Sequence, residues 1–274
     1  MRLLAVWFCL SILLAPMARA GQTFTIGVLP IHSARVLAAR YEPLRAYLEQ
    51  HLNQPARIES AVNFANFQAR TLRGDFDLTI TPAHFARLAQ KDAGFQPLAQ
   101  FVPDHDALLV YAAERPLRDA ADLRGKTLAV IDRLAISVTA VISHLEEQGL
   151  EVGRDYRALE HRTHASAAYS LVNGGALAAV TTSQGLLQMP EDLRGKLVVM
   201  RHVADIPAFV FVARPEASPA RVARLKSLLL AFPNHPEGGE FLRRIGYSAV
   251  LPASEQRMRR ADAFLKATRA ALRP

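Results

Sequence analysis

The sequence predicts an α/β protein of two lobes, in which two α/β domains are joined by paired crossover strands. Strand and helix patterns alternate along most of the chain, which is typical of domains with a parallel sheet between helices. Two long apolar strand patterns, residues 107–113 and 208–213, each end near an Arg-Pro pair and bracket the middle of the chain. We therefore expect lobe I to comprise 21–106 and 208–274, and lobe II to comprise 107–207.

Lobe I begins with a βαβαβ pattern. Its expected strands are residues 23–29, a strand around Ile58, 77–80 and 98–101, and its expected helices are 41–52, 64–72 and 84–91. Leu44, Tyr47 and Leu48 form one apolar stripe on the first of these helices. The stripe is the face that we expect to pack on the sheet.

The end of the chain is predicted to be helical and to pack back on lobe I. The expected helices are residues 219–231, 240–245 and 254–272. Ser218 precedes Pro219, and a capping residue followed by proline at the first helical position is a typical helix start.

Lobe II repeats the alternation of strands and helices. Its expected strands are residues 127–131, 157–159, 178–181 and 197–200, and its expected helices are 137–148 and 165–172. The strand at 127–131 follows a turn at Gly125 and leads into the helix near Ser137. In open α/β sheets, ligands bind beside the carboxyl ends of strands, where the next helix presents unpaired N–H groups. We expect a binding cleft at this point.

Residues 1–20 are predicted to be a signal peptide that is cleaved during export. A basic residue precedes the apolar run 3–15, and residues 18–20 form a small-x-small cleavage site. The run is too short to span a bilayer, and no second such run follows. Cleavage before Gly21 would remove the only cysteine, Cys9, so the exported chain would have no disulfide and would depend on its core.

Composition and motifs exclude several classes of function. The formal net charge of +8 fits an anionic ligand or an acidic surface. The basic residues are scattered and do not interleave with aromatic residues, so we expect no nucleic-acid partner. The sequence has no nucleophile elbow, zinc-protease motif or Gly-rich phosphate loop. His161 and His164 have helical spacing but only Glu160 beside them, so we expect no catalytic residue, no metal and no cofactor.

Several segments give the chain a resemblance to a known family. They are Tyr41-Glu-Pro-Leu-Arg-Ala-Tyr-Leu-Glu49, Leu72-Arg-Gly-Asp-Phe-Asp-Leu78, Asp122 to Val130, and Asp205-Ile-Pro207. In this order and spacing the chain resembles the phosphate, phosphite and phosphonate binding family, the periplasmic substrate-binding proteins of ABC transporters. The resemblance implies the type II periplasmic-binding-protein fold, a small ligand held between the lobes, and an ABC permease as partner.

The expected pocket departs from the pattern of that family. The family commonly has Tyr where this chain has Phe64 and Phe85, and its loop Asp-x-x-Ser-x-Ser-Gly grips the phosphoryl oxygens. The corresponding segment here, residues 132–138, keeps a hydroxyl only at Ser137, with Thr139 just beyond it. Each hydrogen bond to a charged oxygen contributes ~1.5 to 3 kcal/mol. We therefore expect a retained cleft with a more apolar or less highly charged ligand.

The residues expected to bind the ligand are Ser33, Phe64, Phe85, Arg133, Ser137, Thr139 and His164. Ser33 and Ser137 would present helix N-termini, and Arg133 would offer a planar grip on an anion. His164 stands where the family has a ligand-facing histidine. The alternatives are a helix cap alone for Ser33, a solvated surface residue for Arg133, a helix-start histidine for His164, and ordinary core for the two phenylalanines.

Two functions remain open from the sequence. The first is a monomeric periplasmic receptor that closes two lobes over a small, anionic or altered solute and delivers it to an ABC transporter. The second is a periplasmic sensor subunit that reports the ligand to a membrane histidine kinase or a cyclic-dinucleotide signalling protein. Both need the same hinge closure, which we expect at strands 107–113 and 208–213.

Overall fold

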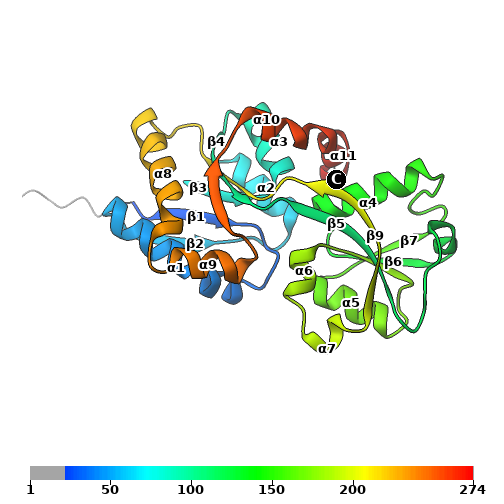
Figure 1. Cartoon of the computed structure of the whole chain (residues 1–274). Coiled ribbons are helices and arrows are strands. Elements are labelled where there is room, and N and C mark those ends of the chain that lie inside the picture. Colours follow the sequence, from blue (N-terminus) through cyan, green and yellow to red (C-terminus); the bar gives the residue numbers. More distant parts are fainter. Residues whose placement is uncertain (1–21, 274) are drawn as a thin grey trace, which may run out of the picture.

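The computed structural model describes residues 22–273, so the predicted signal peptide, residues 1–20, lies outside the described residues. The chain forms two sheets, and each is flanked by its own helices in one of two lobes (Figure 1). One sheet has the strand order β11-β4-β10-β3-β1-β2, and the other has the order β7-β6-β8-β5-β9. The α/β class and the two-lobed arrangement agree with the prediction from sequence.

The six-stranded sheet of lobe I is mixed. Its strands are β1 (Phe24–Val28), β2 (Ala56–Glu59), β3 (Leu78–Thr81), β4 (Gln96–Val102), β10 (Val210–Ala213) and β11 (Ala249–Pro252). β1 pairs in parallel with β2 and β3, whereas β10 lies antiparallel between β3 and β4. The expectation that 208–213 is a crossover paired with 107–113 is therefore wrong, because β10 finds both of its neighbours inside lobe I.

The helices of lobe I cover both faces of this sheet. They are α1 (Ala34–Leu52), α2 (Phe64–Leu72), α3 (Ala83–Ala93), α8 (Pro219–Ala231), α9 (Gly238–Ile245), α10 (Glu255–Arg259) and α11 (Leu265–Leu272), with 3-10 turns at Phe232–Asn234 and Arg260–Phe264. α1 begins earlier than expected, because the Ser33 hydroxyl caps it by accepting from the Val36 N–H at 3.4 Å. The single helix expected at 254–272 is interrupted by the 3-10 turn.

The five-stranded sheet of lobe II contains the strands that join the lobes. Its strands are β5 (His105–Ala112), β6 (Thr127–Val130), β7 (Arg157–Glu160), β8 (Ala178–Thr181) and β9 (Leu197–Ile206), and its helices are α4 (Ile136–Glu147), α5 (His164–Val172), α6 (Ser183–Leu187) and α7 (Glu191–Arg194), with a 3-10 turn at Ala120–Leu123. β6 pairs in parallel with β7 and β8, and β5 lies antiparallel between β8 and β9. β9 continues well beyond the expected 197–200. The paired crossover strands are therefore β5 and β9.

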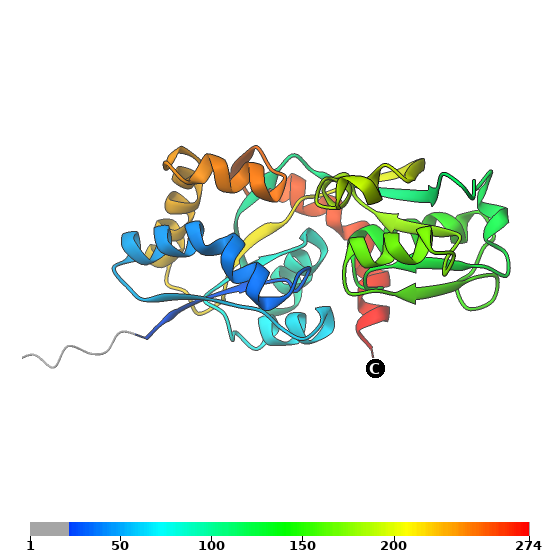
Figure 2. The ribbon, with the colours of Figure 1, turned by 90° about the horizontal axis from the view of Figure 1, so that it is seen from below.

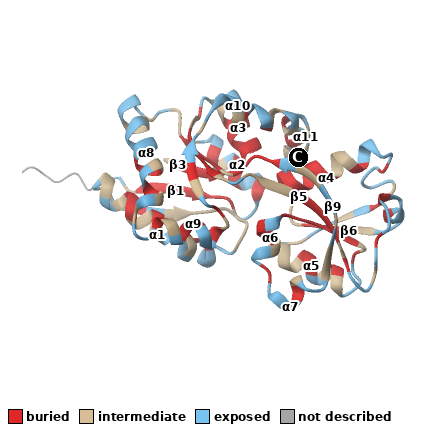
Figure 3. Cartoon of the chain, in the orientation of Figure 1, coloured by how far each residue is buried: buried red, intermediate tan, exposed pale blue. Residues whose placement is uncertain are grey.

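Buried residues concentrate in the strands and on the inner faces of the helices in both lobes (Figure 3). One apolar cluster crosses the boundary between the lobes. It contains Phe64 and Phe85 of lobe I together with Leu134 and Ile136 of lobe II. Burial of apolar surface contributes ~25 cal/mol per Å², so side chains of the protein itself hold the lobes together at this point.

The C-terminal segment also contacts both lobes. Figure 2 shows it running from lobe I towards lobe II along one side of the molecule. Phe264, Ala271 and Leu272 pack against the same apolar cluster, which includes side chains of α4. The last helices therefore add a contact between the lobes besides the β5 and β9 strands.

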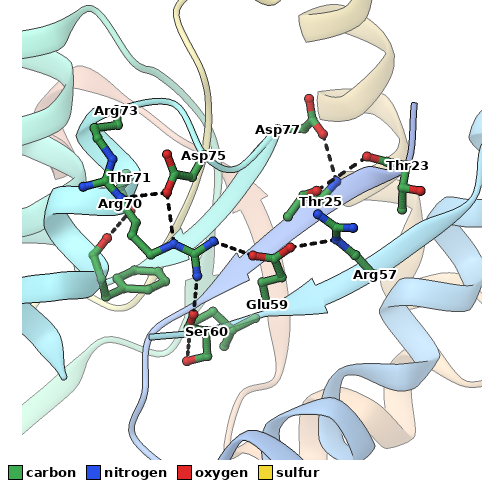
Figure 4. Close-up of polar contacts among 12 residues, drawn as sticks. Thr23, Thr25, Arg57, Glu59, Ser60, Arg70, Thr71, Arg73, Asp75 and Asp77 are labelled. Carbon is green, nitrogen blue, oxygen red and sulfur yellow. Dashed lines mark hydrogen bonds and ion pairs between the residues drawn. The ribbon is translucent and has the colours of Figure 1, made fainter. Parts of the chain in front are cut away.

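The segment 72–78, which contributes to the family resemblance, forms a structural turn (Figure 4). Gly74 has a φ of +76°, a left-handed conformation that glycine adopts without a Cβ penalty. Asp77 then accepts a hydrogen bond from the Thr25 N–H at 2.8 Å. The turn thus fixes the start of β3 beside β1.

Arg70 ties this turn to the neighbouring strand (Figure 4). Its guanidinium donates to the Asp75 carboxylate at 3.0 Å and to the Ser60 carbonyl at 2.7 Å, and it forms an ion pair with Glu59. It also lies 4.6 Å from the centre of the Phe76 ring. These contacts hold α2 against β2, so this motif stabilises lobe I without lining the cavity between the lobes.

Candidate functional site

A cavity of about 340 Å³ lies between the two lobes. Both lobes and the connections between them contribute to its lining, which is mainly apolar. The apolar lining includes Leu29, Phe64, Ile136, Ile206, Phe209 and Ile245. Among the described residues that line the cavity there is no carboxylate, and Arg40 supplies the one guanidinium.

Three of the residues predicted from sequence are brought together at this cavity. Phe64 begins α2, Ser137 lies in the first turn of α4, and His164 begins α5, and all three line the cavity. They come from three helix N-termini in two lobes. This is the arrangement expected from strands whose carboxyl ends meet at a cleft.

The other predicted residues do not line the cavity. Ser33 caps α1, and Phe85 is fully buried in the apolar cluster. Arg133 is exposed, beside the turn before α4. The Thr139 hydroxyl is buried and donates to the Ala135 carbonyl at 3.2 Å, within its own helix start.

The turn before α4 already uses most of its backbone donors. The Leu134 N–H donates to the Asp132 carboxylate and the Ala135 N–H to the Asp132 carbonyl, both at 2.8 Å. The Arg133 N–H points to the Glu160 carboxylate at 3.4 Å. Burial raises the pKa of Asp132, and the charge of Glu160 adds to this effect. The backbone donors of this turn are thus occupied by Asp132 and Glu160, although neither residue lines the cavity.

The start of α4 retains some free donors. Within residues 22–273, no hydrogen bond uses the Ser137 hydroxyl or the backbone N–H groups of Ile136 and Ser137. The cap residue, Ala135, has no side chain that can satisfy them. A polar group of a ligand can therefore be accepted at the Ser137 end of the cavity.

Three histidines line the cavity, two of which sequence reasoning missed. Burial lowers the pKa of both His105 and His164 to about 4, and the nearby histidines lower the pKa of His164 further. Burial also lowers the pKa of His32, with the charge of Arg40 as a second cause. At neutral pH these imidazoles are therefore uncharged and act as hydrogen-bonding groups.

His105 and His164, both half-buried, are held by neighbouring hydroxyl groups. His105 shares a hydrogen bond with the Tyr247 hydroxyl, which joins the start of β5 to lobe I. The His164 Nδ1 lies 3.2 Å from the Thr181 hydroxyl. The orientation of each ring is thus determined by the protein.

Arg40 forms a contact across the lobe boundary. Its Nη1 donates to the His32 Nε2 at 2.9 Å and to the Gln188 Oε1 at 3.1 Å. His32 and Arg40 belong to lobe I, whereas Gln188 follows α6 in lobe II. A sequence signal for Arg40 exists, since it lies three residues after Leu37 and four before Leu44, beside the buried stripe of α1.

The short helix α6 was not predicted, yet it supplies one side of the cavity. The Thr182 hydroxyl caps it by accepting from the Gly185 N–H at 2.9 Å. Gln184, Gly185 and Gln188 line the cavity. Gln184 also lies close to Gly246 of lobe I. A Cβ added to Gly246 would lie 2.9 Å from the Gln184 Cγ.

Other kinds of site find no support in the part of the chain that the structure describes. Among residues 22–273, no group of three or more His, Cys, Asp or Glu side chains is placed to hold a metal ion. None of the described helices is long and apolar enough to span a membrane.

Comparisons with known proteins agree with this architecture. A family model described as "ABC transporter, phosphonate, periplasmic substrate-binding protein" matches residues 26–258. A binding-protein component of an ABC phosphonate transporter from Pseudomonas aeruginosa is similar in structure, with 16% identity, a TM-score of 0.79, and coverage of 92% of this chain and 89% of that chain.

Two further solved structures share the fold. PhnD1 from Prochlorococcus marinus, in complex with methylphosphonate, has 13% identity and a TM-score of 0.80, with 90% of this chain and 98% of that chain covered. XAC2383 from Xanthomonas citri, bound to chloride, has 18% identity and a TM-score of 0.76, with 91% and 98% covered.

Proposed function

The chain belongs to the family of periplasmic substrate-binding proteins of phosphonate ABC transporters, and from this membership we propose that it captures its solute in the cavity between its lobes. Members of this family act in the periplasm, bind a small molecule and work with a membrane permease. Binding in the cavity would stabilise the closed form that a permease recognises.

We further propose that the ligand has an apolar body and at most one negative charge. The observation that carries this proposal is the apolar lining at positions where related proteins have hydroxyl groups. Phe64 and Ala135 line the cavity, and the N–H groups of residues 133–135 already bond to Asp132 and Glu160. A phosphonate that carries up to two charges would therefore find, at the start of α4, only the free donors of Ile136 and Ser137.

The balance of charge supports the same conclusion. Arg40 is the one formally cationic side chain among the described cavity residues, and the three histidines are neutral at pH 7. A cavity of low polarity favours a ligand whose charge is matched within it, because unmatched charge is costly to desolvate. One guanidinium can match one anionic group.

Titration calorimetry with matched probes tests this proposal. The probes are methylphosphonate, phosphate, pentylphosphonate and pentanesulfonate, where the last two differ only in the head group. We expect pentanesulfonate to bind more tightly than pentylphosphonate at pH 8, and methylphosphonate to bind weakly. Sub-micromolar affinity for methylphosphonate or phosphate would contradict the proposed change of ligand class.

The contact residues, the absence of catalysis, the oligomeric state and the export of the protein are further proposals. We propose that Ser137 and His164 contact the ligand, that the protein acts by binding without catalysis, and that it is a monomer whose residues 1–20 are removed on export. Light scattering checks the oligomeric state, and the intact mass of the exported protein checks a start at Gly21.

The alternative function, a periplasmic sensor, would require that a gene beside the one for this protein encodes a kinase or a cyclic-dinucleotide enzyme in place of a permease.

A further inference from the structure

We propose that Arg40 binds a single carboxylate or sulfonate group of the ligand and so makes the protein selective for an anion. We propose also that Arg40 couples this contact to lobe closure through Gln188. The inference rests on the proposed function and adds where the anionic group lies. It places that group on lobe I, away from the turn before α4.

The first observation is that Arg40 has no acidic partner. In the part of the chain that the structure describes, no ion pair includes Arg40, whereas Arg45, Arg70 and Arg87 are each paired with carboxylates. Arg40 is half-buried and lines a cavity without a carboxylate. A half-buried guanidinium without a counter-ion can pair with an anion from outside the protein.

The second observation is that one part of the guanidinium remains available. Nη1 is used by His32 and Gln188, but within residues 22–273 no hydrogen bond uses Nε or Nη2 of Arg40. The planar fork of a guanidinium suits a bidentate contact with a carboxylate or sulfonate. The Tyr41 hydroxyl, which also lines the cavity and has no partner among these residues, can supply a further donor.

The opposite wall offers an anion no cation. The start of α4 supplies only the Ser137 hydroxyl and the N–H groups of Ile136 and Ser137, because Asp132 and Glu160, which do not line the cavity, accept the other backbone donors of that turn. Among the described cavity residues, Arg40 is therefore the one formally cationic side chain that can pair with an anionic head, while an apolar body can contact Phe64, Ile136 and Phe209.

Arg40 also connects the ligand to closure. Gln188 lies 148 residues away in the sequence and belongs to the other lobe, so its 3.1 Å contact with Arg40 exists only when the lobes are together. An anion on Nε and Nη2 would fix the guanidinium plane and leave Nη1 directed towards Gln188. Binding and closure would then reinforce each other, as linkage requires.

The test of the charge contact uses pentanoate, pentanesulfonate and the neutral pentanamide. We expect the wild-type protein to prefer both anions to the amide. Arg40→Gln should weaken both anions roughly 10- to 100-fold, as expected for hydrogen bonds to a charged group, and should leave the amide nearly unchanged. Arg40→Lys should restore part of the loss. Arg35→Gln, at an exposed position of the same helix that does not line the cavity, is the matched control.

The test of coupling uses two variants of Gln188 and small-angle scattering. Gln188→Glu places a carboxylate on Arg40, so it should keep the protein compact while lowering anion affinity. Gln188→Ala should reduce the compaction that pentanesulfonate causes and weaken its binding. Melting temperatures show that each variant is folded. If Arg40→Gln unfolds the protein, Gln188→Glu carries the test of the charge contact.

The outcomes separate the inference from the proposed function. If the wild-type protein prefers the anions and Arg40→Gln retains that preference, the role of Arg40 is disproved while the proposed ligand class stands. If Gln188→Glu leaves anion affinity unchanged, the inference also fails. If the wild-type protein binds none of the three probes, or binds the amide as tightly as the anions, the proposed ligand class itself is disproved.

Discussion

Single residues decide the chemistry of the cavity by small changes in side-chain polarity. Phe64 and Ile136 fill space without offering donors, and Ser137 keeps a hydroxyl in the first turn of α4. His105 and His164 are half-buried and neutral at pH 7, so they offer hydrogen bonds without charge. Apart from Ser137, these side chains preserve the cleft while they lower the affinity expected for a multiply charged ligand.

Two glycines with the same backbone conformation allow the contact between lobes to be tested. Gly125 and Gly246 have φ values of +70° and +85°, but a Cβ at Gly125 would meet nothing within 4 Å, whereas one at Gly246 would meet Gln184. We expect both alanine variants to lose ~1 to 2 kcal/mol through backbone strain. Gly246→Ala should lose more, because Gln184 of the other lobe must also move. Urea denaturation measures both losses.

The Gln184→Ala background supplies the control for that experiment. Removing the Gln184 side chain should bring the cost of Gly246→Ala close to that of Gly125→Ala. If Gly125→Ala and Gly246→Ala lose the same free energy of unfolding in the wild-type background, α9 and α6 do not approach each other in solution as they do here.

At the scale of elements, a buried arginine fastens the C-terminal helices to lobe I. The Arg87 side chain on α3 is only 6% exposed, and it bonds to Asp262 at 2.8 Å and to Glu255 at 2.9 Å. Asp262 lies in the 3-10 turn between α10 and α11, so one side chain fixes both helices. These helices also reach lobe II through Leu272.

Arg87→Met is expected to lower the free energy of unfolding by ~1 to 3 kcal/mol, since it removes the buried partner of two carboxylates, which keep only the exposed Lys91 and Arg259. The hydrogen bond from Arg87 lowers the pKa of Asp262 to about 2, so the variant should also raise that pKa. Urea denaturation and a titration followed by NMR measure the two effects. Arg259→Met is the control, because Arg259 is exposed and pairs only with Glu255. A loss no larger than that of the control would contradict this account.

At the scale of the whole molecule, acid should destabilise the folded state. Burial lowers the pKa values of His84, His105 and His164 to about 4, against an ordinary value of 6.5. Between pH 6.5 and 4 the unfolded chain binds protons that the folded chain excludes, so the free energy of unfolding falls as the pH falls. One unit of pKa shift corresponds to ~1.4 kcal/mol. Stability should therefore be full above about pH 6.5 and decline steadily below it.

Thermal unfolding between pH 8 and pH 4.5 checks this dependence. His84 Nε2 lies 2.9 Å from the Leu134 carbonyl, across the lobe boundary, and the amide of a His84→Gln variant can keep a donor there without titrating. That variant should show a flatter pH dependence, whereas His202→Gln, at an exposed position, should not. A wild-type melting temperature that is constant down to pH 4.5 would disprove the account.

Much of the fold follows from local patterns in the sequence. The helix at Phe64–Leu72 and the strands β6 and β8 are short apolar or amphipathic segments bounded by turn residues, so their positions could be predicted closely. The family resemblance was also confirmed by the match over residues 26–258. The strand at Ala249–Pro252 and the short helix α6 were missed, because segments of this length carry too little periodicity to identify.

The pairing of strands could not be derived in the same way. β10 and β9 both contain apolar segments near the return to lobe I, and only the sheet registers show that β9 pairs with β5. Strand pairing depends on which edges meet in space, and the composition of a strand does not encode its neighbour.

The sequence by itself determined the two-lobed α/β class, the family and the loss of hydroxyl groups near Ser137, because periodicity and short motifs are local properties of a chain. The tertiary structure alone decided which groups face the cavity. Arg40, His105 and Gln188 come together from α1, β5 and the end of α6, and the local sequence at most places Arg40 beside a buried stripe, without showing that the three residues meet. Their role arises from long-range packing, which places distant side chains around one desolvated space.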